Sequence, residues 1–317
     1  MRQILICLLI GLTWTCGTAS AANGATRSVD LRYVAHVEAV PPDAARLALW
    51  IPLPQTDLFQ EISDLAVTCP LPYEITTEEV YGNKTLYLET EDPPADFDVE
   101  IAFSVTRREN GAPAGRNRDA ALVELALQSQ TLIPLSEEVR KRAEEIVAGH
   151  DGAAAQARAL YDHTLNHMAY DKSGAGWGRG DYRHACDVGR GNCTDFHSYF
   201  IALCRNIGIP AYFEIGVSLP AERGEGKTGG YHCWAYFWDG EAWVPVDISE
   251  ADKHPDRAAY FFGAHDENRV AFTKGRDLIL RPAQAGGPLN FLIHPYAEVD
   301  GNVYLGVSKE VFYEDGT

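Results

Sequence analysis

Long apolar runs are missing from this 317-residue chain, and their absence argues against an integral membrane protein. The most apolar stretch, Ile4 to Leu12, is too short to span a bilayer, since a spanning helix takes about 20 residues. No later segment approaches that length. We therefore expect no membrane-spanning segment.

Positive charge is also scarce, with 27 Lys and Arg against 45 Asp and Glu, a formal net charge of −18 and a pI near 4.9. Nucleic acid and anionic lipid repel such a chain, so neither is an expected partner. The acidic residues form no Asp-x-Asp-x-Asp-Gly calcium loop. The glycines of Ser173 to Gly180 lack the spacing of a phosphate- or dinucleotide-binding loop. We expect no cofactor, and a flexible glycine-rich loop beside a cleft.

Cysteines are few as well, which excludes a small disulfide-rich scaffold. Five of the seven follow the first 21 residues: Cys69, Cys186, Cys193, Cys204 and Cys233. If Cys193 stays reduced, the other four could form two disulfides, with a connectivity that the sequence leaves open. A zinc site is an alternative, but no common zinc spacing fits the candidates His184, Cys186, Cys193 and His197, so we expect no metal site.

The N-terminus has the pattern of a secretory signal peptide: Arg2, the apolar run Ile4 to Leu12, and the small residues Ala19-Ser20-Ala21. We expect residues 1–21 to be removed after Ala21, and the mature protein to be periplasmic or secreted. Cys16 would suit a lipoprotein, but Thr15 in front of it fits that cleavage signal poorly.

The remaining length predicts about two domains. In residues 22–115, apolar residues alternate with mostly polar ones from Leu31 to Ala39 and from Val99 to Val105, and Gly82-Asn83 resembles a hairpin turn. These patterns predict a small N-terminal β-sandwich domain that has no catalytic cluster of its own.

Residues 116–317 are predicted to form the catalytic domain. Ser136 and Asp151 are placed to cap two successive helices. The last segment, Phe291 to Tyr313, turns at Asp300-Gly301, and we expect it to form a terminal hairpin on the core sheet of this domain.

The strongest chemical signal is Gly191-Asn192-Cys193, which opens a helix. Asn192 suits the N-cap position, and Asp195 suits the matching position of a capping box. The apolar residues that follow recur at helical spacing up to Gly208-Ile209-Pro210. Cys193 would lie in the first turn, where free N–H groups and the helix dipole favour the thiolate. These groups lower the pKa of the thiol below its usual value of about 8.5. The alternative is a cysteine that merely begins a core helix.

Residues Tyr231 to Asp247 predict a β-hairpin about Asp239-Gly240. A symmetric hairpin pairs His232 with Asp247, with Cβ atoms about 4.5–5.5 Å apart. Pro245 disfavours a two-residue turn, whereas a four-residue loop keeps the same pairs. A G1 bulge would shift the register by one and separate the pair.

Cys193, His232 and Asp247 together supply a nucleophile, a general base and an orienting carboxylate for acyl transfer. His197 lies on the same helix face as Cys193 and is a rival base, but it lacks an evident carboxylate partner. Cys233 lies on the strand face opposite to His232, so we do not expect it to compete as a nucleophile.

These segments resemble the transglutaminase-like superfamily. The resemblance covers roughly residues 151–263 and consists of GNCTDFHS at 191–198, GIPA at 208–211, YHCW at 231–234 and WVPVDIS at 243–249. It implies an α+β fold with a papain-like core, in which helices pack on an antiparallel sheet. It also implies that Cys193, His232 and Asp247 are the catalytic triad.

Two differences argue against protein cross-linking. Many members carry Arg two residues after the Gly-Ile-Pro proline, where this chain has Tyr212. The sequence also shows no C-terminal sandwich domains of the kind found in animal transglutaminases.

We therefore expect hydrolysis or acyl transfer at amide bonds of peptides or proteins through a thioester, with hydrolysis favoured. The backbone N–H of Cys193 and the side chain of Trp177 are candidate oxyanion donors. The alternative is a non-catalytic peptide-binding module that keeps the fold.

Overall fold

The computed structural model describes residues 24–111 and 117–316. The predicted signal peptide, its cleavage site and Cys16 lie outside the described residues. Within the described ranges, no helix is both long enough and apolar enough to cross a bilayer.

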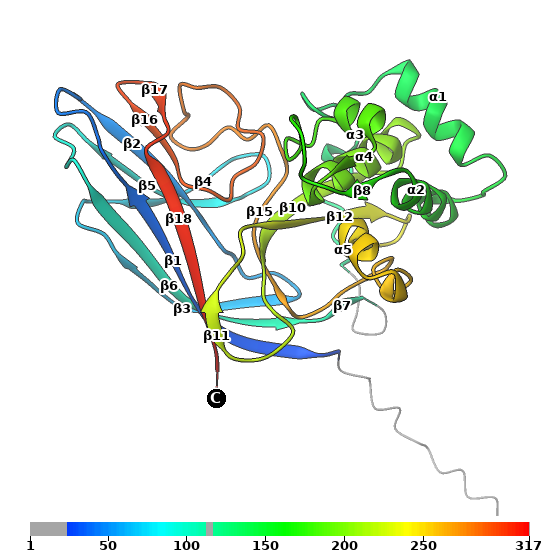
Figure 1. The fold of residues 1–317 in the computed structure, drawn as a ribbon, viewed down its shortest axis with the longest axis horizontal. Helices are drawn as coiled ribbons and strands as arrows, with labels where there is room; N and C mark the ends of the chain where they lie inside the picture. Colours follow the sequence, from blue (N-terminus) through cyan, green and yellow to red (C-terminus); the bar gives the residue numbers. More distant parts are fainter. Residues whose placement is uncertain (1–23, 112–116, 317) are drawn as a thin grey trace, which may run out of the picture.

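Two five-stranded antiparallel sheets form a sandwich (Figure 1). The first has the order β11-β18-β1-β6-β3, and the second has the order β17-β16-β2-β5-β4. Apolar side chains from both sheets meet in one core. The strands are β1 (Thr26–Val37), β2 (Leu47–Leu53), β3 (Gln60–Thr68), β4 (Glu74–Thr77), β5 (Lys84–Thr90), β6 (Phe97–Arg108), β11 (Glu225–Lys227), β16 (Tyr296–Val299), β17 (Asn302–Tyr304) and β18 (Val307–Asp315).

The alternation that predicted strands near Leu31 and Val99 is confirmed, because β1 and β6 bury every second residue along most of their length. The two strands pair in antiparallel register from Thr26↔Arg108 to Val37↔Phe97. Their buried faces supply much of the sandwich core.

The prediction that the C-terminal hairpin lies on the core sheet of residues 116–317 is wrong. Asp300-Gly301 does turn the chain between β16 and β17, but β16 pairs with β2. The last strand, β18, pairs with β1 from Val37↔Val307 to Val29↔Asp315. Alternation shows which face of a strand is buried, but it does not show which sheet supplies the partner strand. Without β18, the second edge of β1 would have no partner.

The second half of the fold is a four-stranded antiparallel sheet, β13-β12-β10-β15, packed against helices. Its strands are β10 (Ala211–Ser218), β12 (His232–Trp238), β13 (Trp243–Val246) and β15 (Arg269–Lys274), and the helices are α1 (Glu137–Ile146), α2 (Ala153–His167), α3 (Tyr182–Val188), α4 (Cys193–Asn206) and α5 (Ile248–Lys253). Short elements complete it: η1 (Leu125–Leu127), η2 (Pro255–Arg257), β7 (Asn110–Gly111) paired with β14 (Ala264–His265), and β8 (Ala169–Tyr170) paired with β9 (Arg190–Gly191).

Helix α4 lies at the centre of this half. It contacts β10 and β12 on one side and the other four α-helices around it. Every residue from Cys193 to Arg205 is therefore buried. Figure 1 shows the helices gathered on the side of the core sheet that faces away from the sandwich. The predicted α+β class with helices on an antiparallel sheet is confirmed.

Two helix starts were predicted before α4. Ser136 does cap α1, because its side chain accepts a hydrogen bond from the Val139 N–H. Asp151 does not cap α2, whose N-cap is Gly152 at φ 82°. The positive φ explains why glycine holds this position.

Side-chain amides join the sandwich to the core sheet at β15. Gln60 donates to the Ala271 carbonyl and accepts from the Ala271 N–H, at 3.0 and 2.8 Å. Asn83 does the same with Lys274, at 2.8 and 2.9 Å. These amides satisfy backbone groups of β15, the strand at one edge of the core sheet, and they fix its position against the sandwich.

Candidate active site

The first turn of α4 has the capping box predicted from its sequence. Asn192 accepts from the Thr194 N–H at 2.9 Å, and Asp195 accepts from the Asn192 N–H at 2.9 Å. Cys193 is thereby held as the first helical residue. A Cβ at Gly191 would collide with the Asp195 carboxylate, so glycine is required just before the cap.

Asp195 also fixes the glycine-rich loop in front of the helix. Its carboxylate accepts hydrogen bonds from the N–H groups of Gly178 and Gly180, at 2.6 and 2.9 Å. The loop expected to be flexible is therefore attached to the α4 N-terminus. This attachment places Trp177 beside the start of α4.

The hairpin register differs from the predicted one by two residues. Trp238 pairs with Trp243, and Ala235 pairs with Val246, around a four-residue loop. His232 is thus not directly opposite Asp247, which lies past the end of β13 as the N-cap of α5. A shift by an even number keeps both side chains on one face of the sheet. They remain diagonal neighbours within reach of each other.

His232 and Asp247 form a direct pair. His232 Nε2 lies 2.6 Å from Asp247 Oδ2, and both residues are buried. This contact leaves Nδ1 as the ring nitrogen available to a reacting group. Burial lowers the pKa of His232, but the Asp247 carboxylate and the Cys193 thiolate outweigh burial and raise that pKa to about 10.

Arg269, on β15, is a site residue that the sequence did not reveal. Its Nη1 donates to Asp247 Oδ2 at 2.9 Å, and its guanidinium lies 5.2 Å from the centre of the Trp234 ring. The other Asp247 oxygen accepts from Ser249 and from the Glu250 N–H. Burial raises the pKa of Asp247, yet the His232 and Arg269 charges hold it well below its usual value.

Cys193 lies next to His232 in the interior and is 2% exposed. Burial raises the pKa of its thiol, but interactions with Cys233 and His232 and the charge of the His232 imidazole hold that pKa well below the usual value. The structure therefore brings Cys193, His232 and Asp247 together in the order thiol, imidazole, carboxylate.

Cys233 is closer to Cys193 than its strand face suggested. Its sulfur lies 3.7 Å from Thr194 Oγ1 and 3.8 Å from His197 Nδ1, and its thiol interacts with Cys193. Burial and the Cys193 charge raise the pKa of Cys233 well above its usual value. It remains a protonated thiol that faces the Cys193 sulfur.

His197, the rival base, has both ring nitrogens engaged by the backbone. Nδ1 lies 2.7 Å from the Cys193 carbonyl, and Nε2 accepts from the Ile248 N–H at 3.1 Å. Burial lowers the pKa of His197, so its imidazole is neutral. It ties the start of α4 to the start of α5 and has no nitrogen left for proton transfer.

The remaining cysteines form no disulfide in the structure. All five described cysteines are free thiols, so the two possible disulfides are absent. Among residues 24–111 and 117–316, no group of three or more His, Cys, Asp or Glu side chains is placed to hold a metal ion.

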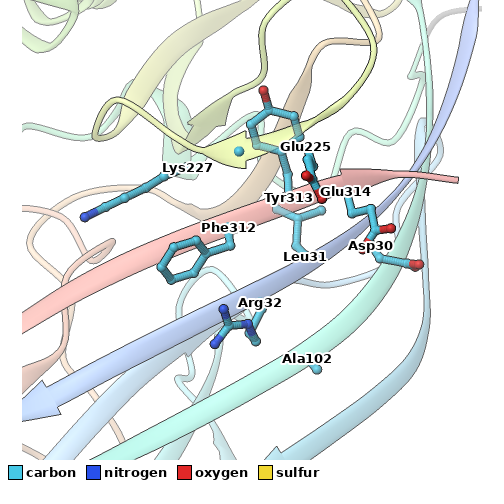
Figure 2. Close-up of a pocket in the computed structure, with 10 residues that line it drawn as sticks. Asp30, Leu31, Arg32, Ala102, Glu225, Lys227, Phe312, Tyr313 and Glu314 are labelled. Atoms are coloured by element: carbon cyan, nitrogen blue, oxygen red, sulfur yellow. The ribbon is translucent and has the colours of Figure 1, made fainter.

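A cleft of about 520 Å³ opens at His232. It runs between the Gly229-Gly230 segment, helix α5 and the loop before β15, and Tyr170 and Arg269 also line it. A second pocket, of about 610 Å³, lies on the sandwich where β11 and β18 meet β1 (Figure 2). None of its lining residues is Cys, His or Ser, so it offers no comparable chemistry.

Comparisons with known proteins agree with this geometry. Residues 140–248 match the model of the Transglutaminase-like superfamily, and the match covers all three site residues. An uncharacterized protein of Haemophilus influenzae is 28% identical over 311 residues, covering 84% of each chain. A solved structure from Cytophaga hutchinsonii, described as a candidate cysteine protease, has a TM-score of 0.61 at 14% identity, over 93% of this chain and 92% of that one.

The Haemophilus and Cytophaga similarities extend beyond the matched core into the sandwich, since each covers more than four fifths of the chain. At 14% identity, the Cytophaga structure shows a shared fold. Residues 140–248, which include the cysteine, histidine and aspartate, are thus similar to the Transglutaminase-like superfamily, and the match covers about a third of the chain.

Proposed function

We propose that this protein is a cysteine-dependent hydrolase or acyltransferase that acts on amide bonds of peptides or proteins. The observation that carries the proposal is the buried chain of contacts from Cys193 through His232 to Asp247. A thiol, an imidazole and a carboxylate in this order form the working unit of nucleophilic acyl transfer.

In the proposed reaction, the Cys193 thiolate attacks the carbonyl carbon of the amide. The backbone N–H of Cys193, at the start of α4, is a donor for the oxyanion that forms. Protonated His232 gives its Nδ1 proton to the leaving amine, the C–N bond breaks, and a thioester remains. Trp177 is the candidate second oxyanion donor.

The thioester is then resolved by water. Neutral His232 accepts a proton from the water as it attacks, the C–S bond breaks, and the acid product leaves with the thiolate restored. A primary amine in place of water would give a new amide. We favour hydrolysis in the periplasm or outside the cell, as the sequence patterns of residues 1–21 and 208–212 suggest.

One observation favours the peptide-binding alternative. Cys193 is 2% exposed and does not line the cleft, whereas His232 does. A binding module would need only the cleft, but an enzyme must let a carbonyl carbon reach the sulfur.

The test is a peptide mixture incubated with wild-type protein, Cys193→Ala and His232→Ala, with products identified by mass spectrometry. Wild-type protein should release new carboxyl termini, and both variants should be inactive while keeping their circular dichroism spectra. Added primary amine should leave acids as the main products. Peptide cleavage that persists in Cys193→Ala would refute the proposal.

A further inference from the structure

The cleft at His232 carries an excess of positive charge in an acidic protein. Besides His232, four Lys and Arg side chains and two carboxylates line it; the former are Lys172, Lys253, Arg257 and Arg269, and the acids are Glu250 and Asp266. The chain as a whole has a formal net charge of −18. A cleft of opposite sign to the rest of the surface concentrates anions.

Both carboxylates of the cleft are already paired. Glu250 Oε1 lies 2.7 Å from Lys253 Nζ. Asp266 lies 3.5 Å from Arg257 and 3.5 Å from Arg269, and Arg269 also pairs with Asp247. The carboxylates therefore neutralise Lys253, Arg257 and Arg269 at least in part.

Lys172 has no carboxylate partner among the described residues. Its ammonium group lies 5.7 Å from the centre of the Tyr170 ring and 5.8 Å from that of Trp177. The neighbouring Asp171 faces Arg190 instead, at 3.7 Å. Lys172 is therefore the cation of the cleft that is free to bind a ligand.

Lys172 lies on the nucleophile's side of the cleft. The Tyr170 ring that it contacts packs 6.3 Å from Phe196, in the first turn of α4. Lys253 lies over the same Tyr170 ring at 4.0 Å. Two ammonium groups thus flank one aromatic ring beside the helix turn that carries Cys193.

We infer that the substrate is an anionic acyl donor, a peptide whose carboxylate lies close to the scissile amide and is held by Lys172, with Lys253 beside it. The inference rests on the proposed function and names its substrate class. The carboxylate could be an acidic side chain or a free C-terminus, since both present the same group to an ammonium.

The experiment compares alkylation of Cys193 by iodoacetate, which is anionic, and by iodoacetamide, its neutral analogue. The rate with iodoacetate is divided by the rate with iodoacetamide, and the result is divided by the same ratio for glutathione. This normalised ratio measures the attraction of an anion to the cleft. It should exceed one at low salt and fall as salt is added, because salt screens the cleft charges. The ratio should fall about threefold in Lys172→Gln, and further in Lys172→Glu.

The matched control is Lys141→Gln, which removes an exposed lysine of α1 that does not line the cleft. Its ratio should equal that of wild type. If Cys193 reacts readily but the ratio is the same in all four proteins, the inference is wrong and the proposed function stands. If Cys193 reacts no faster than an ordinary thiol with either reagent, the proposed function itself fails.

Peptide substrates then separate the two sources of the carboxylate. Pairs that differ only as Glu against Gln test a side chain, and pairs that differ as C-terminal acid against amide test a free terminus. One kind of pair should show a preference for the acid in kcat/KM that disappears in Lys172→Gln but persists in Lys141→Gln. Equal turnover of acid and neutral members in both kinds of pair would overturn the inference.

Discussion

Cys193 is buried beside two groups that can donate a hydrogen bond to its sulfur, the His232 imidazole and the Cys233 thiol. An isolated buried thiol would stay protonated, because burial disfavours the charged form. Here the interactions outweigh burial, so we expect the thiol and the imidazole to rest as an ion pair. The reactive state therefore depends on contacts made by side chains far apart in the sequence.

Replacing Asp247 by Asn should disrupt this ion pair. Asn can still cap α5, so the helix start is preserved. Loss of the carboxylate charge should lower the pKa of His232 and raise that of Cys193, and kcat should fall about 10³-fold or more. Alkylation by iodoacetamide at pH 6 would show the lost thiolate directly. An unchanged rate at that pH would contradict the role of Asp247.

Replacing Cys233 by Ala tests the second hydrogen-bond donor to Cys193. Without the Cys233 thiol, the pKa of Cys193 should rise, although His232 still faces it. The pH profile of Cys193 alkylation should therefore move to higher pH, by less than in Asp247→Asn. A profile that stays in place would show that Cys233 is only a packing residue.

The pH dependence of turnover should have two limbs. Cys193 has a lowered pKa, so activity should be lost only when the pH falls through that low value and the thiolate is protonated. His232 has a pKa raised to about 10, so the alkaline limb should appear as the pH rises through about 10 and the general acid loses its proton. A measured kcat/KM profile with an acid limb near pH 8.5 would contradict this assignment.

At the scale of elements, the start of α4 was predictable because its signals are local. The N-cap, its capping-box partner and the apolar period all lie within one short segment, and the structure has each of them. The hairpin was less predictable. Turn residues located the loop region, but the loop spans residues 239–242 and is centred one residue later than predicted, which moves the register by two. Arg269 had no local signal, since it reaches Asp247 from another strand.

Asp195 should matter more than an ordinary cap. Its carboxylate serves three backbone N–H groups, those of Gly178, Gly180 and Asn192. Each buried donor left without a partner costs about 1–3 kcal/mol. The free energy of unfolding of Asp195→Ala, measured in urea, should therefore be about 3 kcal/mol or more below that of wild type. The loop that carries Trp177 should also be released, which lowers kcat beyond the loss of stability.

Ser136→Ala is the matched control, because it removes the N-cap of α1 instead. This substitution should lower the free energy of unfolding by about 1 kcal/mol and leave Cys193 reactivity unchanged. Equal effects of the two variants on Cys193 reactivity would show that Asp195 has no special relation to the site.

At the scale of the whole molecule, the chain does not divide into two consecutive domains. Strands from both ends complete the sandwich, and β11, from the middle of the second half, extends its first sheet. Arg27 reinforces this closure by pairing with Asp315 and donating to the Pro220 carbonyl. Such long-range pairing leaves no mark on the local pattern, which is why the alternation predicted the strands but not their sheet.

Removal of residues 296–316 should therefore prevent folding of both halves. It exposes one edge of β1 and one edge of β2, and it removes Asp315 from buried Arg27. Circular dichroism should show no cooperative melting. If the truncated protein melts cooperatively and keeps Cys193 reactivity, the half that carries Cys193 folds independently of the sandwich.

The central claim is that Cys193 rests as a thiolate paired with His232. The most direct test is the pH dependence of iodoacetamide alkylation, followed by mass spectrometry at Cys193 and at Cys69, a half-buried thiol whose pKa is raised by burial. We predict that Cys193 reacts quickly at pH 6 and that His232→Ala abolishes this reaction, while Cys69 reacts only at alkaline pH. Alkylation of Cys193 that follows the same pH profile as Cys69, with or without His232, would contradict the claim.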